Sequence, residues 1–312
     1  MVDYDVLVLG EINVDLILWA DEIAPAFGQE RLVEEATLTP GSSSVIFACG
    51  AARLGLRVGF VGVVGDDEFG RFMLRQMADR GVDVGPAIVD PAVKTGVTVS
   101  LSTAADRALL TYAGSIAALT PERVDRALLS RARHLHVSSF FLQAGLRRGL
   151  PGLLAGARTK GLTVSLDTGW DPDERWDGGL REALAQADIF MPNAVEARAI
   201  SGQAEVEAAL AALAARVPVV AIKLGAEGAI ACRAGKTVRA APPPVHVVDT
   251  TGAGDSFDAG FVCGYLAGWS LERTLRLACA CGALATRQPG GTVGQPTMAE
   301  ALAALEAMDG RH

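Results

Sequence analysis

The sequence predicts an α/β fold: a three-layer α/β/α sandwich with a mostly parallel central sheet. Its 312 residues suffice for one large domain, and hydrophobic residues make up 50% of them, which is enough for a packed core. Short apolar runs alternate with helical patterns almost to the end of the chain, which indicates right-handed strand-helix-strand units. We therefore expect a single domain over residues 1–312, with no second autonomous unit.

The expected strands are short, rich in β-branched residues and almost continuously apolar, as strands buried on both faces of a parallel sheet are. They occupy residues 4–10, 58–65, 134–140, 162–167, 188–193 and 217–225. The expected helices lie at residues 42–54, 67–80, 121–131, 146–160, 177–186 and 204–215. The third of these has a start signal, because Thr120 can cap it and Pro121 suits the first helical position.

Two segments depart from this rhythm. Residues 11–39 and 94–114 alternate apolar with polar side chains, which is typical of strands with one solvated face. Within the second segment, VTVSLS, the turn AADR and ALLTYAG predict a hairpin. Together the two segments predict a small β-sheet that projects from the main domain as a lid. The alternative is a pair of antiparallel edge strands of the main sheet.

Charge and hydropathy limit the classes of partner. A formal net charge of -8 argues against a nucleic-acid partner, because such proteins present a basic face to phosphates. The first residues lack a signal-peptide pattern, and no apolar run is long enough to span a bilayer, so we expect a cytoplasmic protein with no membrane partner. The five cysteines are odd in number and lie in apolar surroundings that suit buried thiols: Cys49, Cys232, Cys263, Cys279 and Cys281.

The stretch VDTTGAGDSFDAG, at residues 248–260, carries the strongest chemical signal. A strand-like run ends there, Gly252, Ala253 and Gly254 make a turn, and a helical pattern follows. The three amides would be unpaired donors at the positive end of a helix, which attracts an anion. Asp255 beside them could accept a proton from an attacking hydroxyl. The alternative is that Asp255 merely caps its helix.

Two other glycine-containing stretches do not make phosphate-binding motifs. AGKT at residues 234–237 resembles the end of a P-loop, but the first glycine of that motif would fall at Ile230. We expect a hairpin turn there. The glycines of residues 62–70 do not form the dinucleotide fingerprint.

Four motifs together resemble the ribokinase-like (PfkB) carbohydrate kinases over essentially the whole chain. They are the signature DTTGAGDSFDAG, PNAVE at residues 192–196, KLGAEGA at 223–229, and GEINVD at 10–15. The resemblance implies a phosphotransferase with an alcohol group as acceptor. Its substrates would be ATP, used with Mg²⁺, and a small carbohydrate such as a sugar or a sugar acid.

The resemblance also assigns roles to residues. Asp255 would be the catalytic base, and the turn Gly252, Ala253 and Gly254 would be the anion hole for the γ-phosphate. The residues expected to bind ATP are Asn193, Lys223, Gly225, Gly228 and Thr251. Those expected to bind the acceptor are Asn13, Asp15, Gly41 and Ser42. Glu196 would help to place Mg²⁺ indirectly, and Asp249 matches a position that binds a monovalent cation in some members, so K⁺ activation is a hypothesis.

The stretch PGSSSVIFACGAARLG, at residues 40–55, departs from the family pattern. Ile46 stands where many members have an Asn that holds sugar hydroxyls, so ribose and nucleosides lose support as substrates. The serines at 42–44 can supply hydroxyl contacts instead, or only begin a helix. Asp167 follows the end of a strand and is a further substrate candidate. A nucleoside kinase and a catalytically silent sugar- or nucleotide-binding regulator remain alternatives, and an apolar lid edge would suit a homodimer.

Overall fold

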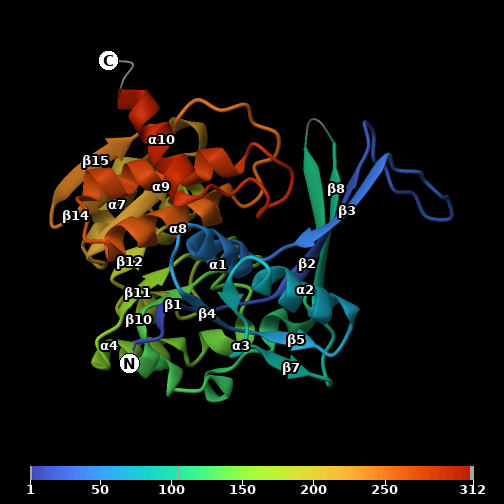
Figure 1. Ribbon diagram of the computed structural model, residues 1–312, viewed down its shortest axis with the longest axis horizontal. Coiled ribbons are helices and arrows are strands. Elements are labelled where there is room, and N and C mark those ends of the chain that lie inside the picture. Colours follow the sequence, from blue (N-terminus) through green and yellow to red (C-terminus); the bar gives the residue numbers. More distant parts are fainter. Residues whose placement is uncertain (1, 104–105, 310–312) are drawn as a thin grey trace.

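A nine-stranded, mostly parallel sheet forms the centre of the protein in the computed structural model, which describes residues 2–103 and 106–309 (Figure 1). Its strands, in spatial order, are β15 (Lys236–Ala240), β14 (Ala229–Arg233), β13 (Val219–Lys223), β12 (Ile189–Phe190), β11 (Thr163–Leu166), β10 (Ala132–Val137), β1 (Tyr4–Leu9), β4 (Val58–Val61) and β6 (Val82–Asp83). The seven strands from β13 to β6 in this order are parallel to one another. Strand β14 pairs antiparallel with β13, and β15 pairs antiparallel with β14. The predicted mostly parallel sheet is therefore confirmed.

Helices cover both faces of this sheet. Successive residues of β1 belong to different cores: Val6 and Val8 pack into one, and Leu7 and Leu9 into the other. The first core is covered by α1 (Ser43–Arg53), α2 (Glu68–Ala78), α8 (Ala253–Leu266), α9 (Leu271–Ala285) and α10 (Met298–Asp309). The second is covered by α3 (Ala144–Arg147), α4 (Leu150–Thr159), α5 (Leu180–Leu184), α6 (Ala194–Ser201) and α7 (Val206–Ala214). The three layers match the predicted architecture.

A separate four-stranded sheet projects from this body (Figure 1). Its strands, in spatial order, are β3 (Glu35–Pro40), β2 (Asn13–Trp19), β8 (Gly96–Ser102) and β9 (Arg107–Tyr112). The expected hairpin is the antiparallel pair β8 and β9, and its turn at residues 104–105 lies outside the described residues. These strands pair with one another and not with the main sheet, so the edge-strand alternative is wrong.

The predicted strand at 58–65 is divided. β4 stays in the main sheet, whereas β5 (Val63–Gly65) pairs with β7 (Ile88–Asp90) in a small two-stranded sheet. The division falls at Gly62, where an added Cβ would lie 2.6 Å from the carbonyl oxygen of Gly10. The chain can change sheets here because only glycine allows such a close approach.

The helix predicted at 121–131 is wrong. The chain makes two short 3₁₀ turns there, Pro121–Arg123 and Leu128–Arg131, with Val124 in an extended conformation between them. The Asp125 side chain accepts a hydrogen bond from the amide of Ala127 at 2.9 Å, and this local bond competes with the helical pattern.

Other helices differ in extent from their predictions. The helix predicted at 146–160 is split at Gly149 into α3 and α4, and the one predicted at 177–186 shortens to α5. Helices α6, α9 and α10 lie outside the predicted set. One further 3₁₀ turn, Gly114–Ala117, follows β9.

Two smaller predictions are confirmed. Residues 234–237 include the turn of the antiparallel hairpin β14 and β15, with Arg233 paired to Lys236. All five cysteines are buried and unoxidised. Within the described part of the chain, none of the helices has both the length and the apolar character needed to cross a bilayer.

Candidate active site

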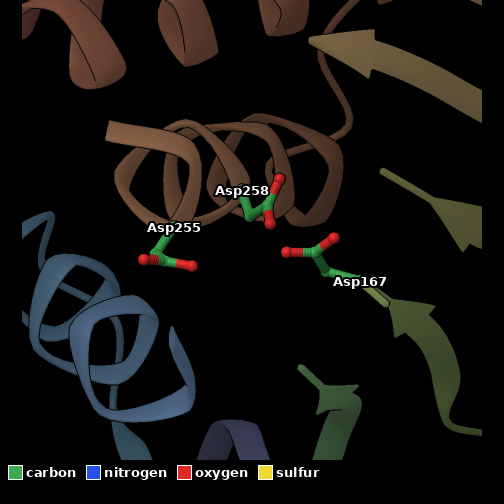
Figure 2. A group of neighbouring side chains, drawn as sticks. All are labelled: Asp167, Asp255 and Asp258. Carbon is green, nitrogen blue, oxygen red and sulfur yellow. The ribbon is translucent and has the colours of Figure 1, made fainter. Parts of the chain in front are cut away.

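The carboxyl edge of the parallel sheet gathers the polar residues of the candidate site. Lys223 ends β13. Asp167 follows β11, and α8 brings Asp255 and Asp258 to the same place (Figure 2). One carboxylate oxygen from each of the three aspartates lies within 4.8 Å of the others. Asp167 and Asp255 were predicted from the sequence and Asp258 was not, although a spacing of three residues puts both aspartates of α8 on one helix face.

Helix α8 begins without a side-chain cap. Its N-cap residue is Gly252, with φ 73°, and the described residues make no side-chain cap hydrogen bond there. By contrast, α1 is capped by Ser42 and α6 by Asn193. Asp255 therefore does not cap α8, and the first-turn amides face the site with the positive end of the helix dipole. Of the expected anion-hole amides, that of Ala253 donates a long hydrogen bond, 3.3 Å, to the carbonyl of Thr250.

The glycine at the N-cap of α8 is required by its surroundings. A Cβ added at Gly252 would lie 2.7 Å from Cα of Gly291 and 2.9 Å from Cγ2 of Ile46. The left-handed φ alone already favours glycine. The turn thus packs between the chain that precedes α10 and the buried face of α1.

Asp255 has the electrostatics of a group that titrates near neutrality. Burial raises the pKa of its carboxyl, and the charge of Asp167 raises it further. Lys223 and a hydrogen bond from the Ser43 side chain lower it, and the resulting pKa is about 7. A carboxylate with this pKa can accept a proton efficiently at neutral pH.

Lys223 lies among these carboxylates. Its Nζ is 3.1 Å and 3.2 Å from the two carboxylate oxygens of Asp258 and 3.3 Å from Oδ2 of Asp167. Burial lowers the pKa of Lys223. The charges of four carboxyl groups raise it by more, so the pKa is raised; these groups belong to Asp167, Asp258, Glu196 and Asp255. The ammonium is therefore charged and directed into the aspartate cluster.

The Asn-x-x-Glu motif forms the N-terminus of α6. Asn193 donates from its amide to one carboxylate oxygen of Glu196, at 2.9 Å, and from Nδ2 to the other, at 2.7 Å. The side chain of Asn193 in turn accepts from the amide of Glu196, which completes a capping box. Burial, followed by the charge of Asp167, raises the pKa of Glu196 to about 7, although Lys223 lowers it.

The turn after β13 contains the two glycines expected near the nucleotide. Gly225 begins the 3₁₀ turn Gly225–Glu227, and its φ is 62°. Gly228 has φ 88°, and a Cβ there would lie 2.0 Å from the carbonyl oxygen of Ala240. The motif thus has a clear local function in the turn from β13 into β14.

Asp249 ties the signature turn to the chain before α10. Its Oδ1 accepts hydrogen bonds from the amide and the hydroxyl of Thr251, at 2.8 Å and 2.7 Å. Its Oδ2 accepts from the amide of Gly290 at 2.8 Å. Both carboxylate oxygens therefore hold the backbone that carries the expected anion hole.

The residues expected to bind the acceptor lie together at the base of the small sheet. Nδ2 of Asn13 donates to Oδ1 of Asp15 at 3.0 Å, and the amide of Gly41 donates to the carbonyl of Asn13 at 3.1 Å. A Cβ added at Gly41 would lie only 2.1 Å from Oδ1 of Asp15. Glycine at this position allows the backbone to approach the Asp15 carboxylate.

Ser42 begins α1 in a strained conformation. Its φ is 74°, in the left-handed region that serine rarely adopts, and its Oγ caps the helix by accepting from the amide of Val45. The Ser42 hydroxyl also lies 2.9 Å from Oε1 of Glu11, whose other oxygen accepts from the hydroxyl of Ser44 at 2.6 Å. Glu11 is 3% exposed. Its role could not be predicted from the sequence, because nothing in the motif GEINVD distinguishes a buried glutamate from an exposed one.

Ile46 packs beneath the anion-hole turn. It is 3% exposed, and its Cδ1 lies 2.3 Å from the position of a Cβ added at Gly291. The side chain that replaces the usual Asn is therefore a packing contact between α1 and the turns at Gly252 and Gly291.

An uncapped helix N-terminus at the carboxyl edge of a parallel sheet is a place that suits an anion such as a phosphate group. The pfkB family carbohydrate kinase profile matches residues 3–298, and the chain belongs to this family. The protein is therefore a sugar kinase, a phosphotransferase with an alcohol group as acceptor.

Individual relatives cover nearly the whole chain. A fructokinase of Klebsiella pneumoniae is 33% identical in a 304-residue alignment that covers 93% of this chain and 95% of that protein. A 2-dehydro-3-deoxygluconokinase of Bacillus subtilis is 28% identical, over 95% of this chain and 97% of that protein. The crystal structure of a proposed ribokinase II from E. coli, in complex with ATP and Mg²⁺, superimposes with a TM-score of 0.86 at 27% identity, covering 97% of this chain and 99% of that one. The ribokinase-like fold is thus confirmed.

Proposed function

We propose that this protein transfers the γ-phosphate of MgATP to a hydroxyl of a small carbohydrate, a sugar or a sugar acid. The observation that carries the proposal is Asp255, a carboxyl with a pKa of about 7 in the first turn of an uncapped helix. The similarity to a fructokinase and to a 2-dehydro-3-deoxygluconokinase supports both kinds of acceptor.

In the proposed reaction, the hydroxyl oxygen of the acceptor bonds to the γ-phosphorus while the bond from that phosphorus to the ADP oxygen breaks. Asp255 accepts the proton that the hydroxyl loses. The amides of Gly252, Ala253 and Gly254 stabilise the charge on the transferred phosphoryl group, and each such donor is worth roughly 3 kcal/mol when aimed at developing charge. The amide of Ala253 exchanges its long bond to Thr250 for the phosphate. Proton transfer and positioned donors are the main contributions that a kinase needs.

The acceptor is held by Asn13, Asp15 and Gly41, which already contact one another, with Ser42 beside them. The nucleotide lies on the other side of Asp255, along Asn193, Gly225, Gly228 and Thr251. Mg²⁺ neutralises the phosphates when bound. Oxygen donors suit this ion, and because both oxygens of Glu196 already accept hydrogen bonds from Asn193, that carboxylate fits a role through water.

K⁺ activation through Asp249 remains a prediction. The carboxylate already accepts three hydrogen bonds, from Thr251 and Gly290, so an ion would have to share its oxygens. Equal phosphorylation rates in K⁺ and in a bulky organic cation would reject it.

The small sheet is proposed as the lid over the acceptor and as the contact of a homodimer. One of its faces carries an apolar row of cross-strand partners, Leu38, Leu16, Val99 and Leu110, and the opposite face carries Asp15. Leu110 is 63% exposed. A second copy that covered this face would bury the row, so sedimentation should give twice the mass of the chain, and Leu110→Asp should lower it. A single-chain mass for the unaltered protein would reject the dimer.

The test of the proposed activity is ADP release from MgATP against a panel of ketoses, aldoses, sugar acids, sugar phosphates and nucleosides. Turnover with a sugar or sugar acid is expected. A preference for nucleosides would favour the nucleoside kinase alternative. Saturable binding without turnover would favour the silent regulator, which the presence of Asp255 and its turn argues against.

A further inference from the structure

Among the described residues, Lys223 is the one cation paired with the three-aspartate cluster, through Asp167 and Asp258. Figure 2 shows the three aspartates. Its side chain is 13% exposed, and that of its partner Asp258 is 1% exposed. Both oxygens of Asp258 lie within 3.2 Å of Nζ. Separating the pair would leave a buried carboxylate without a partner, which destabilises the folded state. The pair is therefore expected to keep this one geometry.

The lysine also runs along the anion-hole turn. A Cβ added at Gly254 would lie 3.6 Å from Nζ, 3.8 Å from Cδ and 3.9 Å from Cε of Lys223. The ammonium therefore lies against the first turn of α8, where the helix dipole is positive and no side chain caps the amides. A charge fixed at this place acts on an anion bound by that turn.

We propose that Lys223 contacts the transferred phosphoryl group, and that Asp258 is a positioning residue that holds the ammonium against Gly254. The proposal rests on the proposed function and differs from a nucleotide-lining role for Lys223, because the group it recognises is the terminal phosphate that ATP has and ADP lacks. Lys223 acts through its charge and keeps its protons. The carboxylates that surround it keep its pKa raised, which maintains that charge.

The cluster explains why two further aspartates accompany the base. Three carboxyl groups, those of Asp167, Asp255 and Asp258, surround one ammonium, and Oδ1 of Asp167 has no hydrogen-bond partner among the described residues. Asp258 engages Lys223 through both oxygens, whereas Asp167 does so through one. Asp258 therefore fixes the ammonium.

The primary test is calorimetric and needs no acceptor sugar. Lys223→Met should weaken binding of the non-hydrolysable analogue Mg-AMP-PNP by about tenfold or more, since it removes a charge-assisted contact to the terminal phosphate. It should change the affinity for MgADP by less than about threefold. Equal losses for both nucleotides would overturn the proposal in favour of a nucleotide-lining lysine, and no loss for either would overturn it as well. Lys236→Met, at an exposed lysine of the β14–β15 hairpin, is the matched control.

The positioning role of Asp258 is tested by a double-mutant cycle. Asp258→Asn alone should weaken Mg-AMP-PNP binding about fivefold, and it should have no further effect in the Lys223→Met background, because Asp258 acts only through the lysine. The double variant Lys223→Met with Asp258→Asn leaves one fewer buried carboxylate unpaired than Lys223→Met alone, so it should be the more stable of the two. An effect of Asp258→Asn that is the same with and without Lys223 would contradict the positioning role.

Turnover separates this proposal from the proposed function. With an acceptor that the panel identifies, the double variant should lose about a hundredfold in kcat with little change in KM for the acceptor. If none of the acceptors in the panel makes the unaltered protein release ADP, the proposed function fails. The comparison of AMP-PNP with ADP then still decides the role of Lys223. If the protein turns over and the double variant keeps its kcat, only the present proposal fails.

Discussion

The two ends of the candidate site satisfy their polar groups in opposite ways. At the phosphoryl end, α8 starts with a glycine N-cap and no side-chain cap, and it carries two of the three clustered aspartates. At the acceptor end, α1 is capped by Ser42, and the hydroxyls of Ser42 and Ser44 contact the buried Glu11. The first end needs a ligand to complete its interactions, whereas the second is already closed. We infer that the phosphoryl end provides the chemistry and that the acceptor end provides a rigid shape.

The largest effect should come from the base. Asp255→Asn removes the proton acceptor while keeping the size of the side chain, so kcat should fall by about 10³-fold, with acceptor and nucleotide binding retained. The measurement is ADP release, with calorimetry for binding. Asp66→Asn, an exposed aspartate paired with Arg71, is the control and should leave kcat unchanged. Retained turnover in Asp255→Asn would reject its role as base.

The next largest effect should come from the turn that carries the anion hole. Gly252→Ala forces a Cβ against Gly291 and Ile46 in a left-handed conformation, so we expect kcat to fall by about 10- to 100-fold as the amides move. Gly235→Ala is the matched control: its φ is 76°, but nothing lies within 4 Å of the added Cβ. Both variants should lose about 1 kcal/mol of unfolding free energy from left-handed strain. Only Gly252→Ala should lose kcat, and equal kcat losses would contradict the assignment.

A change of pH should have a smaller effect on the activity. In the proposed reaction Asp255 accepts a proton only when it is ionised, and its pKa is about 7, raised by burial and by Asp167. Activity should therefore be level above pH 7 and fall toward tenfold per unit below it. Ser43 donates a hydrogen bond that lowers this pKa, so Ser43→Ala should move the acidic limb to higher pH. A profile that is flat from pH 5 to 8 would contradict both expectations.

The phosphoryl end could largely be predicted from the sequence, because its chemistry is local. Gly252, Gly254 and Asp255 lie within four residues, and a turn followed by a helical pattern suffices to place them together. Asp258 and Lys223 are 35 residues apart, and their pairing depends on β13 and α8 meeting at one sheet edge. No periodicity encodes that meeting.

The acceptor end was less predictable for a different physical reason. The strain at Ser42 is a backbone angle, and a serine in the sequence gives no sign of it. The network also depends on Glu11, whose burial follows from β1 lying inside the main sheet. The departure at Ile46 was evident from its residue type, but its packing against Gly252 and Gly291 required the fold.

The smallest effect should come from Ser42 and addresses the acceptor end directly. Ser42→Ala loses the cap and the contacts with Glu11 while keeping the left-handed φ, so it should cost about 2 kcal/mol of unfolding free energy. Ser42→Gly loses the same contacts but relieves the strain, which offsets about 1 kcal/mol of that loss.

Ser270 provides the comparison that isolates the strain. It caps α9 with φ -59°, so glycine and alanine there differ only by their ordinary cap preferences. Glycine should therefore exceed alanine in stability by a larger margin at Ser42 than at Ser270, measured by denaturant unfolding. Equal margins would show that the strain does not contribute. If the Ser42 hydroxyl also contacts the acceptor, both substitutions at Ser42 should raise the acceptor KM alike, whereas a rise in Ser42→Ala alone would assign the effect to the shape of the turn.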